Sequence, residues 1–174
     1  PITPPIIFLF NSMDFFIKQR VFSFRDQFTV FDREKKPVYK VDGKFFSIGD
    51  QLAITTSEGV PVLQIKQHVF SLMPRYSIAN DEKELCVVSK KMSFFRARYE
   101  IEPLGWTIEG SLFDHHYAVK DGTTTIMTVE KEWLSWGDTY HLHVGDPRHE
   151  TISVALMIVL DMVHHQKSKN HSAP

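Results

Sequence analysis

The sequence is short of the residues that several protein classes need. Its 174 residues contain one cysteine, which excludes an intrachain disulfide and a zinc cage built from cysteines and suits a reducing compartment. No apolar run approaches the roughly 18 residues of a membrane-spanning helix. Neither charge sign dominates, because 20 Lys and Arg face 21 Asp and Glu, which argues against a wholly basic nucleic-acid domain. We therefore expect a cytoplasmic protein without a transmembrane span.

Motifs that carry catalysis or cofactor binding are also missing. The sequence holds no G-x-S-x-G elbow, no P-loop and no G-x-G-x-x-G after a strand. Cys86 lies in the apolar stretch Leu85-Cys86-Val87-Val88 and is expected to be a small buried hydrophobe rather than a reactive thiol. We expect no cofactor and no enzymatic activity.

What the sequence does contain is a weak internal repeat of strand type. Fourteen Phe, five Tyr and three Trp favour sheet. An apolar residue is followed four positions later by an aromatic or aliphatic residue and two positions after that by an aliphatic one. The copies are Phe24/Phe28/Val30, Ile48/Leu52/Ile54, Leu72/Tyr76/Ile78, Phe95/Tyr99/Ile101, Phe113/Tyr117/Val119 and Trp136/Tyr140/Leu142. The middle members are 24, 24, 23, 18 and 23 residues apart.

Each copy follows a further apolar stretch, and polar residues, mostly with Gly or Pro, separate the copies. The stretches are 17–22, 41–46, 65–70, 85–92, 106–112 and 126–134. The alternation predicts a strand, a tight turn, a second strand and a loop in each copy. Six hairpins of this kind predict about twelve antiparallel strands.

A single helix is expected near the end of the chain. Asp146-Pro147 is typical of a helix start, and the run from Thr151 to His165 is apolar on every side. A helix without a polar face has to be buried. We therefore predict a mostly β fold, in which a closed antiparallel barrel of about twelve strands surrounds a central hydrophobic C-terminal helix.

The two ends of the sequence differ from this pattern. Residues 1–12 hold three prolines and one apolar cluster, and are expected to be an artificial or upstream extension before Met13; the alternative is an apolar arm that packs on a neighbour. Residues 13–165 form the single barrel domain, and residues 166–174 a polar tail.

Several segments together resemble the LURP-one-related family, most closely its bacterial YxjI-like branch, in the Tubby C-terminal-like superfamily. The resemblance spans Met13 to about His165. It implies a twelve-stranded barrel around a helix, as in Tubby; Tubby binds phosphoinositide headgroups, but no residue here maps onto that site. The segments are Lys18-Gln19-Arg20-Val21-Phe22-Ser23, Gly43-Lys44-Phe45-Phe46-Ser47, Glu109-Gly110-Ser111-Leu112-Phe113-Asp114-His115, Ser135-Trp136-Gly137-Asp138-Thr139-Tyr140 and the helix from Ala155 to Asp161.

Charge is divided unevenly along the chain. Residues 1–98 hold 15 Lys and Arg against 10 Asp and Glu, and residues 99–174 hold 5 against 11, so the halves carry +5 and −6. Such asymmetry is typical of a protein with an anionic partner. The candidate anion-binding residues are Lys90, Lys91, Arg96, Arg98 and, at the equivalent repeat position to Arg98, Arg75. The alternative is that they are solvated residues on the outside of the barrel.

Histidines are weaker candidates, here for a transition metal. His141 and His143 share one face of a strand, and His115 and His116 could add ligands. Their spacing matches no tight ligand signature, so we expect no metal site.

The leading hypothesis is a non-enzymatic binding or scaffold protein, cytoplasmic or peripheral at a membrane. Its basic face would meet an anionic membrane surface or an acidic or phosphorylated partner, and no specific nucleic acid is expected. The alternative is a small-ligand carrier or an enzyme with a cleft at the barrel mouth.

Overall fold

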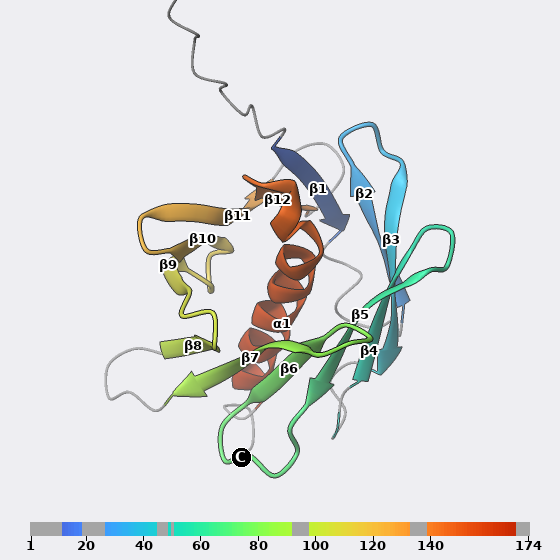
Figure 1. Ribbon diagram of the computed structural model, residues 1–174. Coiled ribbons are helices and arrows are strands. Elements are labelled where there is room, and N and C mark those ends of the chain that lie inside the picture. Colours follow the sequence, from blue (N-terminus) through green and yellow to red (C-terminus); the bar gives the residue numbers. More distant parts are fainter. Residues whose placement is uncertain are drawn as a thin grey trace, which may run out of the picture.

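The computed structural model describes residues 12–18, 27–44, 49, 51–91, 98–132 and 139–169. They form twelve strands, one short 3-10 helix and one long helix (Figure 1). The elements are β1 (Met13–Lys18), β2 (Gln27–Asp32), β3 (Pro37–Lys44), β4 (Gln51–Thr56), β5 (Pro61–Gln67), β6 (Arg75–Ala79), β7 (Glu84–Lys91), β8 (Arg98–Glu102), β9 (Thr107–Ser111), β10 (His116–Asp121), β11 (Thr124–Glu132), β12 (Thr139–Val144), η2 (Pro147–His149) and α1 (Glu150–Lys169).

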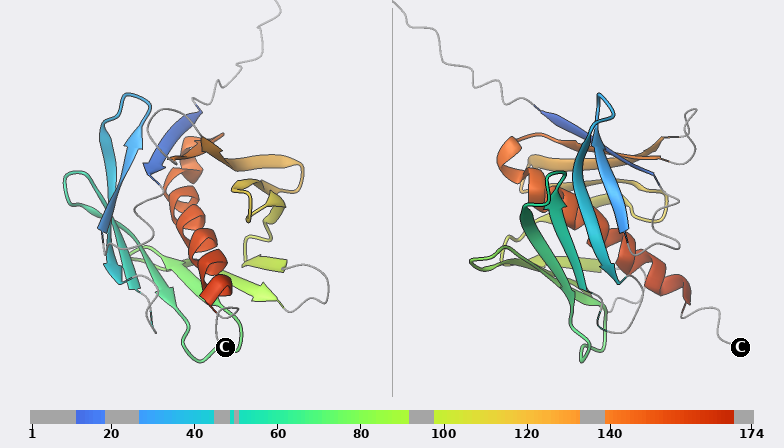
Figure 2. Two further views of the ribbon diagram at one scale, coloured as in Figure 1. Left: turned by 180° about the vertical axis from the view of Figure 1, so that it is seen from behind. Right: turned by 90° about the vertical axis from the view of Figure 1, so that its right-hand side faces the viewer.

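All twelve strands belong to one antiparallel sheet that nearly closes on itself. Its order is β8-β7-β6-β5-β4-β3-β2-β1-β12-β11-β10-β9. The first and last strands of this order meet through a single bridge between Ile101 and Trp106. Figures 1 and 2 show the sheet curving around α1, with β1 to β4 on one side and β9 to β11 on the other. The predicted hairpin barrel is therefore confirmed.

The repeat is explained by which side chains point inward. The final residue of every copy is at most 1% exposed, as in Val30, Ile54 and Ile78. Because side chains alternate along a strand, the middle residue two positions earlier shares the inward face. The first residue behaves differently where it is described, since Leu72 is 103% and Phe113 76% exposed. Two of the three repeat positions thus build the core, while the first, at Leu72 and Phe113, lies in a connection between strands.

Helix α1 fills the barrel. The Asp146 side chain accepts a hydrogen bond from the Arg148 backbone N–H and caps η2, which leads into α1. Every residue from Ile152 to Val163 is at most 8% exposed, Ser153 and Asp161 included. The helix therefore has no solvent-facing side over this length, as its all-round apolar pattern predicts. It extends to Lys169, four residues beyond the expected His165.

The hairpin topology gives the barrel two distinct ends. Neighbouring strands are antiparallel and follow the chain order, so connections after even-numbered strands lie at the end where α1 begins, here called the proximal end. Connections after odd-numbered strands lie at the opposite, distal end, toward which α1 runs. The Tyr39 hydroxyl donates a hydrogen bond to Glu150 at the proximal end, and so joins β3 to the start of α1.

Candidate functional site

A row of basic side chains crosses the outer face of four adjacent strands at the distal end. Lys66 on β5, Arg75 on β6, Lys91 on β7 and Arg98 on β8 are all exposed. The register places Lys66 opposite Ser77, Arg75 opposite Ser89 and Lys91 opposite Arg98. Strands lie about 4.8 Å apart, so the four strands span about 14 Å. We call these four residues the basic row.

The predicted anion-binding residues separate on this framework. Arg75, Lys91 and Arg98 share the outer face, whereas Lys90 is on the same side of β7 as the fully buried Val88. Arg96 lies outside the described residues. Sequence reasoning missed Lys66, because its place beside Arg75 on the outer face depends on the pairing of β5 with β6.

Two carboxylates on β8 accompany the basic row. The Lys91 ammonium lies 3.0 Å from a carboxylate oxygen of Glu100, and both side chains are well exposed. An exposed pair of this kind is worth about 1 kcal/mol or less. Glu102 lies two residues further along the same face of β8 and is also exposed. The row therefore keeps a net positive charge, because four cations face two carboxylates.

The connection between β5 and β6 carries one half-exposed and two fully exposed apolar residues. Val69 is 48%, Phe70 104% and Leu72 103% exposed. Its base is fixed by two backbone hydrogen bonds, from His68 N–H to the Arg75 carbonyl (2.9 Å) and from Lys90 N–H to the Pro74 carbonyl (3.0 Å). We call residues 68–74 the distal loop; it follows β5 directly and returns into β6 at Arg75.

Exposed apolar side chains gather at the distal end in the part of the chain that the structure describes. Of the five large ones, Val69, Phe70, Leu72 and Phe113 lie in distal connections, and Val60 alone lies at the proximal end. The sequence pattern predicted a strand over 65–70, which includes Phe70, and a repeat position at Leu72. In the structure β5 ends at Gln67, so both residues are in the loop.

A second cluster lies on the outer face of β1 and β12. One oxygen of Asp14 is 2.7 Å from His141 Nε2 and 3.0 Å from His143 Nδ1, while Arg33 binds the other oxygen. Burial raises the pKa of the Asp14 carboxyl, but the hydrogen bonds with the two histidines and the charge of Arg33 outweigh it and hold the pKa below its usual value. The ring of Phe16 stacks on His141, 4.8 Å between centroids.

The four candidate histidines occupy three separate places. His141 and His143 both contact the carboxylate of Asp14. The Nδ1 of His116 lies 3.9 Å from a carboxylate oxygen of the exposed Glu130, and His115 points into the barrel. Within the described ranges, no group of three or more His, Cys, Asp or Glu side chains is arranged to hold a metal ion. The contacts of His141 and His143 with Asp14 account for both side chains as part of the barrel wall.

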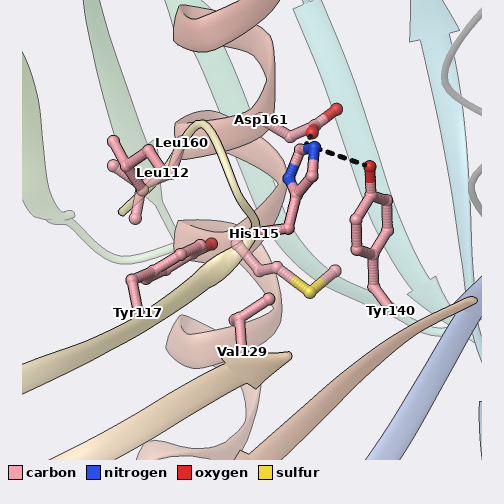
Figure 3. A pocket seen from close by; sticks show the side chains of 8 residues that line it. Leu112, His115, Tyr117, Val129, Tyr140, Leu160 and Asp161 are labelled. Atoms are coloured by element: carbon pink, nitrogen blue, oxygen red, sulfur yellow. Dashed lines mark hydrogen bonds and ion pairs between the residues drawn. The ribbon is translucent and has the colours of Figure 1, made fainter. Parts of the chain in front are cut away.

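His115 lines a small cavity between α1 and the β9–β10 turn (Figure 3). Its Nδ1 lies 3.9 Å from an oxygen of Asp161, and its Nε2 lies 3.3 Å from the Tyr140 hydroxyl. Burial raises the pKa of Tyr117, and the neighbouring Asp161 and Tyr140 add to the effect. The remaining lining residues are apolar: Leu112, Val129, Met157 and Leu160.

The cavity is too small for a substrate. Its volume is about 10 Å³, which is close to the requirement of one water molecule. Ligand pockets are usually about 300–1,000 Å³. The contacts of His115 with Tyr140 and Asp161 instead join the β9–β10 turn to β12 and α1.

The fold and its sites together define a class: a twelve-stranded antiparallel barrel around a buried helix, with a basic row and an apolar loop at one end. The chain belongs to the LURP-one-related family, whose model matches residues 13–161. It is 42% identical over 151 residues to "Uncharacterized protein YxjI" of Bacillus subtilis (strain 168), covering 87% of this chain and 93% of the relative. An X-ray structure of an Arabidopsis thaliana protein has the same fold at a TM-score of 0.59 and 13% identity, covering 86% of this chain and 90% of the other.

Two expectations drawn from the sequence are established: membership of the LURP-one-related family, and a barrel with a C-terminal helix. Among the helices of the described residues, none is both long and apolar enough to cross a membrane.

Proposed function

We propose that this protein is a non-enzymatic binding module that docks on a phosphate-bearing anionic partner through the basic row. The supporting observation is the alignment of Lys66, Arg75, Lys91 and Arg98 on one face of four adjacent strands. Arg presents a planar fork of donors that suits phosphate oxygens, and Lys adds a point charge. An outer sheet face about 14 Å wide suits an extended charged surface better than a small buried ligand.

The charge distribution supports the same assignment. The first 98 residues carry +5, although the whole chain carries −1. A protein with this balance does not bind polyanions through its net charge, so attraction has to come from a local patch. Each Lys or Arg close to an anionic surface contributes about 1 kcal/mol at low salt.

The test is retention on a phosphate-bearing matrix such as phosphocellulose, at low salt and at a pH where histidines are neutral. The double variant Arg75→Glu/Arg98→Glu should elute at much lower salt than the wild type, because removing two contacts alone weakens binding about 30-fold. The matched control is Lys36→Glu/Lys83→Glu, which changes net charge equally at exposed positions of the proximal end. Equal elution of the two double variants would contradict the proposal.

A further inference from the structure

The distal loop holds two large apolar side chains entirely in water. Phe70 and Leu72 are 104% and 103% exposed, so no other part of the described chain shields them. The two backbone hydrogen bonds at the loop base keep the tip beyond the end of the sheet. Single exposed apolar residues are common on protein surfaces, but three within four residues on one projecting turn call for a partner.

Basic side chains surround the base of this loop. His68 and Arg75 flank the loop base, where the His68 backbone N–H donates to the Arg75 carbonyl, and Lys66 is the last exposed residue of β5 before the loop. Lys91 and Arg98 continue the positive face on β7 and β8. The apolar side chains are therefore at the tip of the loop, and the cations are at its base. At a membrane surface this arrangement places aromatic and aliphatic groups at the edge of the lipid hydrocarbon and cations among the anionic headgroups.

We propose that the anionic partner is a lipid bilayer, and that the distal loop inserts Phe70 and Leu72 into its interface while the basic row contacts the headgroups. This inference rests on the proposed function and names its partner. Insertion would be shallow, because one short loop enters, and reversible, because a few side chains provide the apolar contact.

The shape of the loop favours a bilayer over a protein groove. Protein interfaces place anchor residues in preformed pockets with shape complementarity around them. Here the apolar groups are on a loop beyond the end of the sheet, and the outer face of the adjoining strands that the structure describes carries the basic row. A fluid interface adapts to such a tip, and its negative charge matches the basic row.

The test is co-sedimentation of the full chain with vesicles of phosphatidylcholine alone and of phosphatidylcholine mixed with phosphatidylserine. The loop variant is Phe70→Ser/Leu72→Ser, and the charge variant is Arg75→Glu/Arg98→Glu. Val60→Ser is the matched control, since Val60 is 58% exposed in the turn before β5, at the other end of the same strand. Thermal unfolding of each variant checks that the barrel is intact.

We expect wild type and Val60→Ser to bind the mixed vesicles equally at low salt and to bind neutral vesicles much more weakly. The loop variant should lose about tenfold in affinity for each side chain removed, and the charge variant a comparable amount. A loop variant that binds like the wild type, while the charge variant does not, would overturn insertion and leave the proposed function standing. Retention on phosphocellulose without vesicle binding would overturn the bilayer and indicate a phosphate-bearing macromolecule. If the charge variant behaves like the wild type both on phosphocellulose and with the mixed vesicles, the proposed function itself is overturned.

Discussion

Replacing three consecutive residues of α1 by alanine, one at a time, tests whether the helix is enclosed on all sides. Leu156, Met157 and Ile158 are at most 2% exposed. Successive residues of an α-helix are rotated by about 100°, so these three side chains point to well-separated sides of α1. A helix lying on the outside of a sheet would leave at least one of them in water.

The expected cost follows from burial at each position. Truncating a buried Leu, Ile or Met to Ala removes apolar contacts and leaves a cavity, at about 2–5 kcal/mol. Exposed substitutions usually change stability by about 0.5 kcal/mol or less, which is the expectation for Val60→Ala at the surface. For a domain of this size, each kcal/mol lowers the unfolding temperature by about 2–4 °C.

The assay is urea unfolding followed by tryptophan fluorescence and by circular dichroism, with thermal unfolding in parallel. All three variants should lower the unfolding midpoint with an unchanged slope, and Val60→Ala should leave it in place. If any one of Leu156→Ala, Met157→Ala or Ile158→Ala is as stable as Val60→Ala, the helix has a solvent-facing side and the barrel account is wrong.

Three further predictions follow from local contacts. Asp14→Asn should lower the free energy of unfolding at neutral pH, and the difference from wild type should shrink below about pH 4. The pKa of Asp14 is lowered in the folded protein, so the ionised carboxylate stabilises the fold and protonation removes that contribution. A pH-independent difference in urea midpoint would contradict this. Gly110→Ala should cost about 2 kcal/mol or more, since Gly110 has a φ of +100° and an added Cβ would lie 2.5 Å from the His116 carbonyl oxygen; a wild-type melting temperature would refute it. Burial raises the pKa of the Cys86 thiol to about 12, so it should react with a disulfide reagent only upon unfolding, and fast labelling of the native protein would be inconsistent with this.

The strands and the helix could be predicted because their signals are local and repeated. Each inward residue of the repeat recurs with the period of a strand, as at Tyr76 and Ile78, and strand pairing then follows the chain order. The helix could be predicted because an all-apolar helix in a chain rich in strands has to be buried inside the sheet. Its end at Lys169 could not be predicted, because polar residues at a helix end are compatible with fraying and with continuation of the helix.

The site was predicted less well, because it depends on contacts between distant segments. Nothing in the chain near His141 indicates Asp14, which is 127 residues away in sequence. The clustering of Lys90 with Lys91 ignored the alternation that sends neighbouring strand residues to opposite faces. Arg75 was identified through the repeat, which does carry information about position on the barrel.

The distal loop shows the limit most clearly. Phe70 and Leu72 have the residue types of a strand, and a pattern of residue types does not reveal whether a side chain is covered. Pro74 is typical of a turn, but the start of the loop at His68 depends on where β5 stops pairing with β6. Exposure of these two side chains became visible only with the barrel assembled.

The measurement that tests the membrane-docking account most directly is the fluorescence of a polarity-sensitive dye attached at position 70. Because Cys86 is buried with a raised thiol pKa, Phe70→Cys can be labelled selectively, and Val60→Cys provides the same dye at the opposite end. Adding phosphatidylserine-containing vesicles should shift the emission of the dye at position 70 to the blue and make it accessible to a quencher carried on the lipid chains, with no change at position 60. Unchanged emission at position 70, or the same shift at both positions, would contradict insertion of the distal loop.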